Sequence, residues 1–179
     1  PGFDTNLFVN GISSKDYSAL RDSADVPLFN RAVQGQYPPG STLKPVLALA
    51  GLHHRIVTAE STVDDPGFYR LPGVTHKYRD WKAHGNGVDL MVSMEQSCDV
   101  YYYDLAHRLG IDKIHTFAAQ FGLGQRTLID ITSEGSGLLP SREWKQRAYR
   151  QPWFPGETLI LGIGQGYMLA TPMQLAHMT

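Results

Sequence analysis

Residues 37–50 read YPPGSTLKPVLALA, and this stretch decides the fold. Its two prolines and its glycine exclude regular helix from residues 37–40. From Val46 onward the stretch is apolar on nearly every side, which is typical of a buried helix. Pro45 fits such a helix only in its first turn. The stretch therefore predicts a central, buried helix with Ser41 at its N-terminal end.

Helical patterns return along the rest of the chain. They cover a short helix from Ser14 and residues 90–96, 100–109, 113–121 and 141–147. Gly110 is suited to end one of these helices, and Thr171-Pro172 starts a last one with an N-cap residue followed by proline. Residues 129–131 are expected to form a short strand. Residues 56–87 lack clear periodicity and predict a long irregular connection, which is uncommon unless it is functional.

The composition is that of an ordinary folded domain. Of the 179 residues, 42% are hydrophobic and 18% are charged, which excludes disordered, collagen-like and coiled-coil chains. The formal net charge of −1 excludes a strongly basic surface, so we expect no nucleic-acid partner. No window approaches the roughly 18 consecutive apolar residues of a membrane span. Because the chain begins at Pro1 without Met and stops at Thr179 inside a predicted helix, we expect a piece of a larger protein.

Ser41 and Lys44 form the first candidate catalytic pair. A serine hydroxyl is a weak nucleophile and needs a base within hydrogen-bond reach. Positions i and i+3 share one face of a helix, so Lys44 can reach the Ser41 oxygen. Burial favours the neutral amine, and the helix N-terminus supplies N–H groups for an oxyanion. The alternative is an N-cap serine beside a surface lysine, because the spacing by itself is common.

Ser97-Cys98-Asp99 is the second candidate, and it interrupts two helical stretches. In an extended loop, Ser97 and Asp99 point one way and Cys98 points the other. Ser97 would then relay a proton, and Asp99 would accept a hydrogen bond from a lysine or a substrate amide. The alternative is that the two polar residues only cap the helix that starts at Val100.

Cys98 also suggests a metal site. It faces the preceding irregular connection, which carries Asp64, Asp65, Asp80 and His84. One thiolate, one imidazole and two carboxylates suit a tetrahedral Zn²⁺ site that would brace the loop, with Asp65, Asp80, His84 and Cys98 as its ligands. The alternative is a buried reduced cysteine, with the loop carboxylates acting as turn formers.

Taken together, these motifs resemble those of a known family, the penicillin-binding proteins. Residues 41–44 after YPPG resemble the family's first active-site box, and residues 97–99 resemble its Ser-x-Asn box in an Asp variant. The segment GIGQGYMLATPMQLA at residues 162–176 also resembles the family. Three further segments resemble one group of this family, the class B, cell-elongation group. They are residues 6–13, 78–82 and 141–145.

The resemblance implies an α+β fold of the serine β-lactamase and penicillin-binding-protein transpeptidase type. Residues 1–179 would be a partial transpeptidase domain, mainly its helical part. The family's third box, Lys-Thr-Gly or Lys-Ser-Gly, is not found in the chain. The family places this box on a strand further downstream, so we expect the fold to be incomplete and this piece to be inactive by itself.

The resemblance implies a serine-type D,D-transpeptidase that cross-links peptidoglycan stem peptides during cell elongation and maintains rod shape. Ser41 would be the nucleophile and Lys44 its general base. Ser97 would help to return a proton to the leaving amine, and Asp99 would orient Lys44 and the substrate. β-Lactams would acylate Ser41, which makes the protein an antibiotic target. A β-lactam sensor and a serine β-lactamase of the same fold are the alternatives.

The resemblance also implies a setting for the protein. No cofactor is required for the reaction, and the structural zinc ion suggested by Asp65, Asp80, His84 and Cys98 would take no part in it. The expected partners are stem peptides, β-lactams and a membrane glycosyltransferase of the elongation machinery. The expected location is the periplasmic face of the bacterial inner membrane, with an N-terminal anchor that lies outside this chain.

Overall fold

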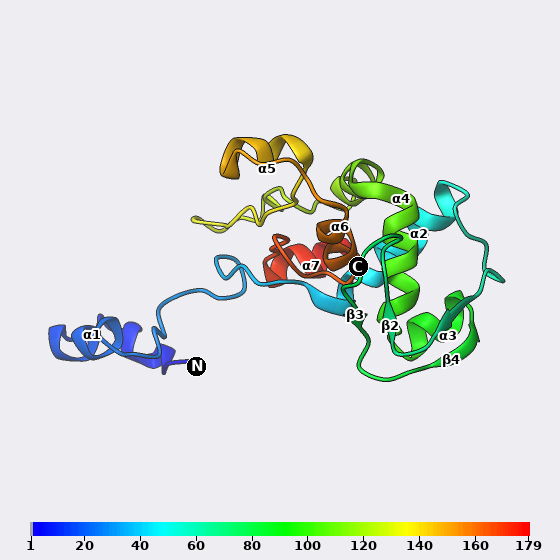
Figure 1. Ribbon diagram of the computed structural model, residues 1–179. Helices are drawn as coiled ribbons and strands as arrows, with labels where there is room; N and C mark the ends of the chain where they lie inside the picture. The colour runs from blue at the N-terminus through cyan, green and yellow to red at the C-terminus, as the bar shows by residue number, and fades with distance from the viewer. Residues whose placement is uncertain (1) are drawn as a thin grey trace.

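The computed structural model describes residues 2–179. Its body is built around helix α4 (Asp99–Ala119), which packs against α2 (Lys44–His53) and α6 (Pro155–Gly162) (Figure 1). The core consists mainly of apolar side chains from these three helices. The Leu105 side chain of α4 packs directly on Gly51 of α2, where a Cβ atom would lie 2.8 Å from a methyl carbon of Leu105.

Helix α2 follows a 3-10 turn, η2 (Gly40–Leu43), and carries Pro45 in its first turn as predicted. The prediction that this helix is buried on every side is wrong. Leu49 is 48% exposed and Leu52 is 38% exposed, because α4 covers only one side of α2. The opposite side lines an apolar groove together with Phe121 and the C-terminal helix.

Gly110 interrupts α4 as the sequence predicts. Its backbone has φ 75° and ψ 159°, which is not helical, and the chain resumes helical geometry beyond it. Only glycine adopts this conformation at low cost, because it has no Cβ atom. The predicted helices at residues 100–109 and 113–121 are therefore two halves of one kinked element.

Residues 56–87 contain strands where an irregular connection was predicted, so that prediction is wrong. Strand β1 (Val63–Asp65) pairs with β4 (Gly85–Val88), and β2 (Phe68–Tyr69) pairs with β3 (Tyr78–Arg79), both antiparallel. Strands of two to four residues are too short to show an alternating hydrophobic pattern. Packed beside the helices, they give the mixed α and β composition that was expected.

The remaining helices confirm most of the predicted positions. They are α1 (Ser14–Arg21), α3 (Leu90–Glu95), α5 (Arg142–Tyr149) and α7 (Pro172–Met178), with a 3-10 turn η1 (Thr5–Phe8) near the N-terminus. Thr171 caps α7 as expected, and its backbone N–H donates to Gln174 in return. The strand predicted at residues 129–131 is wrong, because the N–H of Ile131 donates to the carbonyl of Ile129 and folds the segment into a tight turn.

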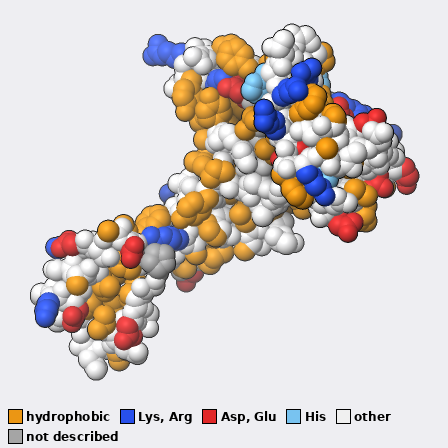
Figure 2. Space-filling model, turned by 60° about the horizontal axis from the view of Figure 1, so that its bottom comes forward, with side chains coloured by type: hydrophobic (Ala, Val, Ile, Leu, Met, Phe, Trp, Pro, Cys, Tyr) orange, Lys and Arg blue, Asp and Glu red, His pale blue; other side chains and the backbone are white. Residues whose placement is uncertain are grey.

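An arm formed by η1, α1 and the segment after them extends away from the body (Figure 1). Neither η1 nor α1 buries a residue. Hydrophobic side chains are visible along the arm in Figure 2, and Phe8 and Val9 are among its exposed residues. Among residues 2–179, no helix is both long and apolar enough to span a bilayer.

Candidate active site

Ser41 lies in the η2 turn, just before α2, and is exposed. Its Oγ atom lies 2.8 Å from Oγ of Ser97, a hydrogen bond in which either hydroxyl can donate. The backbone next to Ser41 is held from outside the turn, because the N–H of Gly40 donates to the carbonyl of Gly164 at 2.8 Å. The first and second candidate motifs, 56 residues apart, therefore meet at their serine oxygens.

Lys44 is 2% exposed and points into the space between the two motifs. Its Nζ atom donates to Oγ of Ser97 at 3.0 Å and to the Ser97 carbonyl at 2.9 Å. It also pairs with Oδ1 of Asp99 at 2.5 Å. The sequence predicted that Lys44 reaches Ser41 directly, but in residues 2–179 these contacts connect it to Ser41 through the Ser97 hydroxyl.

In the loop at Ser97, the side chains of residues 97–99 point to two opposite sides, as predicted. Ser97 adopts a left-handed backbone conformation with φ 55°, and Cys98 is the N-cap of α4. Ser97 and Asp99 contact Lys44, whereas Sγ of Cys98 lies 3.4 Å from Oδ2 of Asp65 on the other side. The division of side chains matches the prediction, but the extended backbone on which the prediction rested is wrong at Ser97.

The capping alternative for Ser97 and Asp99 is wrong. The N-cap of α4 has no capping side chain of its own, and the N–H of Val100 donates to Oδ2 of Asp80 at 2.9 Å. Asp80 belongs to the loop after β3, far away in the sequence. The side chains of Ser97 and Asp99 are consequently free to contact Lys44.

Asp99 sits in a partly buried, charged environment. Burial raises the pKa of the Asp99 carboxyl, and the hydrogen bond and positive charge of Lys44 oppose this shift. The contact with Nζ of Lys44 thus offsets part of the cost of burying the Asp99 charge. The ring of Tyr102 faces the same amine, with its centroid 5.2 Å from Nζ.

Gly164 supports the site from a segment far along the chain, where its backbone packs tightly against Gly40. It has φ +68°, and a Cβ atom built on it would overlap the backbone of Gly40, including its carbonyl oxygen. Only glycine allows the 162–166 segment to lie against the turn that carries Ser41. The regular glycine spacing of this segment was the available signal.

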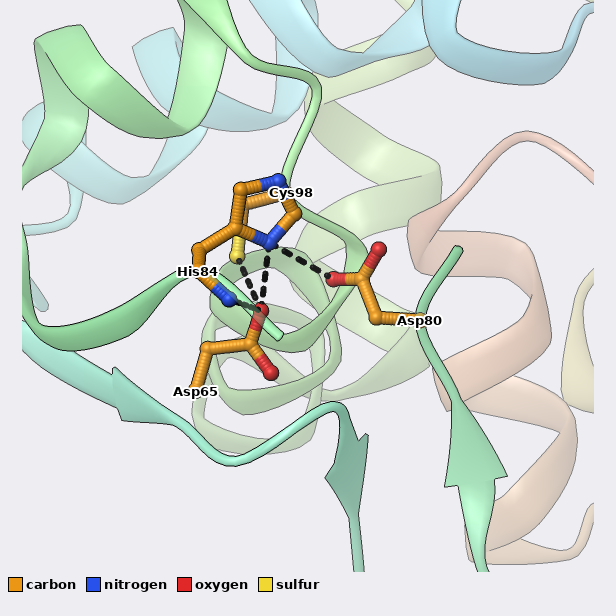
Figure 3. A group of neighbouring side chains, drawn as sticks. All are labelled: Asp65, Asp80, His84 and Cys98. Carbon is orange, nitrogen blue, oxygen red and sulfur yellow. Dashed lines mark hydrogen bonds and ion pairs between the residues drawn. The ribbon is translucent and has the colours of Figure 1, made fainter. Parts of the chain in front are cut away.

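Asp65, Asp80, His84 and Cys98 converge behind the Ser97 loop, as Figure 3 shows. The ligand atoms that they offer all lie within 4.8 Å of one another. Nδ1 of His84 lies 2.5 Å from Oδ2 of Asp65 and 3.6 Å from Oδ2 of Asp80. Asp64, the fifth residue considered, instead accepts a hydrogen bond from the N–H of Gly87.

The environment of this cluster is buried and polar. Burial raises the pKa of the Cys98 thiol to about 12. For Asp65, burial favours the neutral acid, but hydrogen bonds from His84 and Gly67 outweigh it and lower the pKa of the carboxyl. Within residues 2–179, Nε2 of His84 is buried and has no hydrogen-bond partner. A sulfur, a ring nitrogen and two carboxylates form a donor set that fits a tetrahedral zinc ion.

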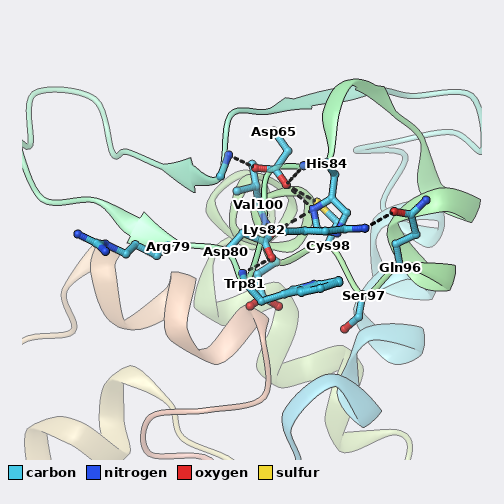
Figure 4. A network of polar contacts seen from close by, with 12 residues as sticks. Asp65, Arg79, Asp80, Trp81, Lys82, His84, Gln96, Ser97, Cys98 and Val100 are labelled. Carbon is cyan, nitrogen blue, oxygen red and sulfur yellow. Dashed lines mark hydrogen bonds and ion pairs between the residues drawn. The ribbon is translucent and has the colours of Figure 1, made fainter.

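The polar contacts between this cluster and the loop that carries Ser97 are shown in Figure 4. Asp80 contacts both the cluster and α4. Its Oδ2 atom faces His84 and also accepts the hydrogen bond that caps α4. The adjacent Trp81 extends its indole toward Ser97 in this view. The sequence analysis missed this dual contact of Asp80, since the cap and the cluster are joined only through the tertiary fold.

Comparisons with known proteins agree with this geometry. The family model described as the penicillin binding protein transpeptidase domain matches residues 1–179. The chain is 52% identical over 180 residues to the peptidoglycan D,D-transpeptidase MrdA of Acinetobacter baumannii, an alignment that covers 100% of this chain and 27% of that protein.

Two solved structures resemble the fold. One is PBP2 of Pseudomonas aeruginosa in complex with WCK 5153, with a TM-score of 0.93 and 59% identity over 100% of this chain and 41% of that one. The other is PBP2 of Helicobacter pylori in its complex with MreC, with a TM-score of 0.88 and 37% identity. That match covers 97% of this chain and 32% of the Helicobacter chain.

The fold and the matched family model define a class of protein: the chain belongs to the penicillin-binding protein transpeptidase domain family. Within this family, its similarity is to MrdA and PBP2, which confirms the class B resemblance. The predicted transpeptidase-type α+β fold is confirmed as well. The chain spans about a quarter of the length of the curated relative that it matches (27%).

Proposed function

We propose that the protein is a peptidoglycan D,D-transpeptidase that works through an acyl-enzyme on Ser41. The observation that carries the proposal is the chain of contacts from Ser41 through Ser97 to Lys44 and Asp99. It supplies a nucleophile, a proton path and a buried base in a chain 52% identical to a D,D-transpeptidase. Residues 1–179 are, on this proposal, part of a transpeptidase domain.

In the first half-reaction, Oγ of Ser41 forms a bond to the carbonyl carbon of the penultimate D-Ala. Ser41 passes its proton to the Ser97 hydroxyl, which gives its own proton to the neutral Lys44 amine. The C–N bond to the terminal D-Ala then breaks. The departing amine takes up the proton that returns from Lys44 through Ser97, and the donor peptide stays on Ser41 as an ester.

Lys44 must be neutral to accept this proton. The three contacts of its Nζ atom match the three N–H bonds of an ammonium group. The neutral form is reached when one proton moves along the 2.5 Å contact to Asp99. Burial of Asp99 raises the pKa of its carboxyl, which favours this transfer. Asp99 thus serves as the proton reservoir and also holds Lys44 in place.

In the second half-reaction, an amine of a neighbouring stem peptide attacks the ester carbon. The bond from this carbon to Oγ of Ser41 breaks, and a new amide joins the two peptides. The amine loses a proton through the same path, and Ser41 regains one. A β-lactam completes only the first half-reaction. Its leaving nitrogen stays attached to the acyl group through the opened ring and blocks the incoming acceptor amine.

Mass spectrometry of the full-length protein after exposure to penicillin tests the proposal. We expect a one-to-one adduct on the wild type and none on Ser41→Ala. An unmodified wild type would overturn the assignment. If the adduct disappears quickly with water as the acceptor, the protein is a serine β-lactamase. If it persists but no cross-link forms with a stem-peptide amine, the protein is a β-lactam sensor.

We further propose a periplasmic location at the inner membrane and partners in the cell-elongation machinery, including a membrane glycosyltransferase. The support is the similarity to MrdA and to the Helicobacter PBP2 that was solved with MreC. Crosslinking of the full-length protein in growing cells, followed by identification of the linked proteins, tests this. Links confined to cytoplasmic proteins would contradict it.

Finally, we propose that Asp65, Asp80, His84 and Cys98 bind a structural Zn²⁺ ion. The support is their convergence and their donor set. A bound ion would replace the thiol proton and brace the loop that carries Ser97. Metal analysis of the purified full-length protein should find about one zinc per chain, lost in Cys98→Ser and retained in Asp64→Asn. A wild type without zinc would contradict the proposal.

A further inference from the structure

Trp81 is 66% exposed, although it is among the largest apolar side chains of the molecule. The proposed reaction gives it no role. It follows Asp80 directly in the loop between β3 and β4, and Figure 4 shows its indole extended toward Ser97. Contact of a tryptophan ring with water costs free energy, so this position beside Ser97 favours a contact with another molecule.

The contacts of the indole place it beside the second catalytic motif. Its ring centroid lies 5.5 Å from that of His84, at an angle of 75°. Nζ of Lys82 lies 4.7 Å from the ring centroid and donates to Oε1 of Gln96 at 3.0 Å. Gln96 directly precedes Ser97. The indole is thus tied to the residue before Ser97 and, through the His84 cluster, to Cys98 after it.

The loop that presents Trp81 is fixed at several points. The Trp81 N–H donates to Oδ1 of Asp80 at 2.7 Å, while Oδ2 of Asp80 accepts from Val100 at 2.9 Å. The N–H of His84 donates to Oδ2 of Asp65 at 3.1 Å. The backbone that presents the indole is therefore preorganised, which lowers the entropy lost when a ligand packs against the ring.

An aromatic face beside the Ser97 motif is suited to pack against a flat peptide group, because both surfaces lose water and little conformational freedom. We infer that Trp81 is a substrate-binding residue that packs against the donor stem peptide, on the acyl side of the attacked carbonyl. The donor side is favoured because it stays attached to Ser41 through both half-reactions. Leaving and accepting amines occupy the site only briefly. This inference rests on the proposed function.

Two acyl donors test the inference on the full-length protein. One is a stem pentapeptide ending in D-Ala-D-Ala, and the other is a short N-acetyl-D-Ala thioester that has no preceding peptide. We expect Trp81→Ala to lower kcat/KM for the pentapeptide about tenfold, mostly through KM, and to leave the thioester unchanged. Trp81→Phe keeps a flat ring and should restore most of the pentapeptide rate.

Because Trp81 also packs on His84, a merely structural effect has to be separated from a binding effect. Zinc content and the thermal midpoint are therefore measured for each variant, and Trp81→Leu, which keeps an apolar contact to His84, replaces Trp81→Ala if the latter unfolds. Leu128→Ala, at a remote residue that is 85% exposed, is the control.

Several outcomes would overturn the inference. An equal loss on both donors assigns Trp81 to the support of Ser97, and an unchanged pentapeptide rate removes it from the substrate site. If the wild type is acylated normally in either case, the proposed function stands while the role of Trp81 falls. If the wild type is acylated by neither donor, the proposed function falls and the role of Trp81 falls with it.

Discussion

At the scale of single residues, Ser97 is the link on which the site depends. Its hydroxyl contacts both Oγ of Ser41 and Nζ of Lys44, at 2.8 Å and 3.0 Å. Ser41, the proposed nucleophile, and Lys44, its proposed base, are therefore connected through a third side chain from another part of the chain. An SxxK pattern alone would place them in direct contact.

Ser97→Ala should slow acylation about 100-fold, because it removes the proton path while leaving the nucleophile in place. The second-order rate with a fluorescent penicillin measures this. Ser14→Ala, in the exposed first turn of α1, should acylate at the wild-type rate. A wild-type rate for Ser97→Ala would show that the proton moves directly between Ser41 and Lys44.

Gly164→Ala should reduce both acylation and stability, because its Cβ atom would overlap the Gly40 backbone beside Ser41. A cost of about 1–3 kcal/mol in unfolding free energy is expected, including the strain of φ +68°. Gly166→Ala is the matched control. It has a similar φ of +74°, but its Cβ atom would meet a side-chain atom of Ile160 at 3.2 Å instead of a backbone. Equal acylation rates in the two variants would contradict the argument.

At the scale of elements, carboxylate side chains hold loops in place. Asp80 caps α4 from the β3–β4 loop. Glu134 fixes the backbone of the loop before α5 from within that loop. Glu134 accepts hydrogen bonds from the N–H and hydroxyl of Thr127 and from the N–H of Leu128. These bonds hold Leu128 at φ 62°, which is unusual for a leucine.

This loop should loosen in acid. The hydrogen bonds from Thr127 lower the pKa of the Glu134 carboxyl below its usual value of 4.5. Its contribution to stability is therefore complete above about pH 4.5 and is lost as the pH falls through the lower folded value. Hydrogen exchange at Thr127 and Leu128, corrected for intrinsic rates, should speed up in that range. Glu134→Gln should show fast exchange already at neutral pH, whereas the exposed control Glu60→Gln should not.

At the scale of the whole molecule, the body and the N-terminal arm differ in packing. Helix α4 buries Tyr101, Tyr102 and Leu105 among its neighbours, but α1 buries no residue. Segments with few buried contacts open at low free energy, independently of the core. The 179-residue chain is thus expected to unfold in two parts.

Limited trypsin treatment of this 179-residue chain should cut first at Arg21, at the exposed end of α1, and leave the body intact. Cleavage sites mapped by mass spectrometry over time provide the check. Early cuts inside α4, for example after Arg108, would contradict the predicted order. Such a result would mean that the body opens at least as readily as the arm.

The expectation that the isolated 179-residue chain is inactive remains a prediction. It rests on the absence of the third box from these residues. Stoichiometric acylation of the isolated chain by a labelled penicillin would contradict it. That measurement is independent of the one on the full-length protein.

The sequence by itself determined the family and the positions of most helices, and it singled out the four side chains that the fold brings together, Ser41, Lys44, Ser97 and Asp99. It could do so because these features depend on local spacing and on capping patterns such as that at Thr171. The tertiary structure alone decided that Lys44 reaches Ser41 through Ser97, that Asp80 caps α4, and that Gly164 supports Gly40. Each of these contacts joins segments that lie 20 or more residues apart. No local pattern records such distances, because they are set by how α2, α4 and α6 pack.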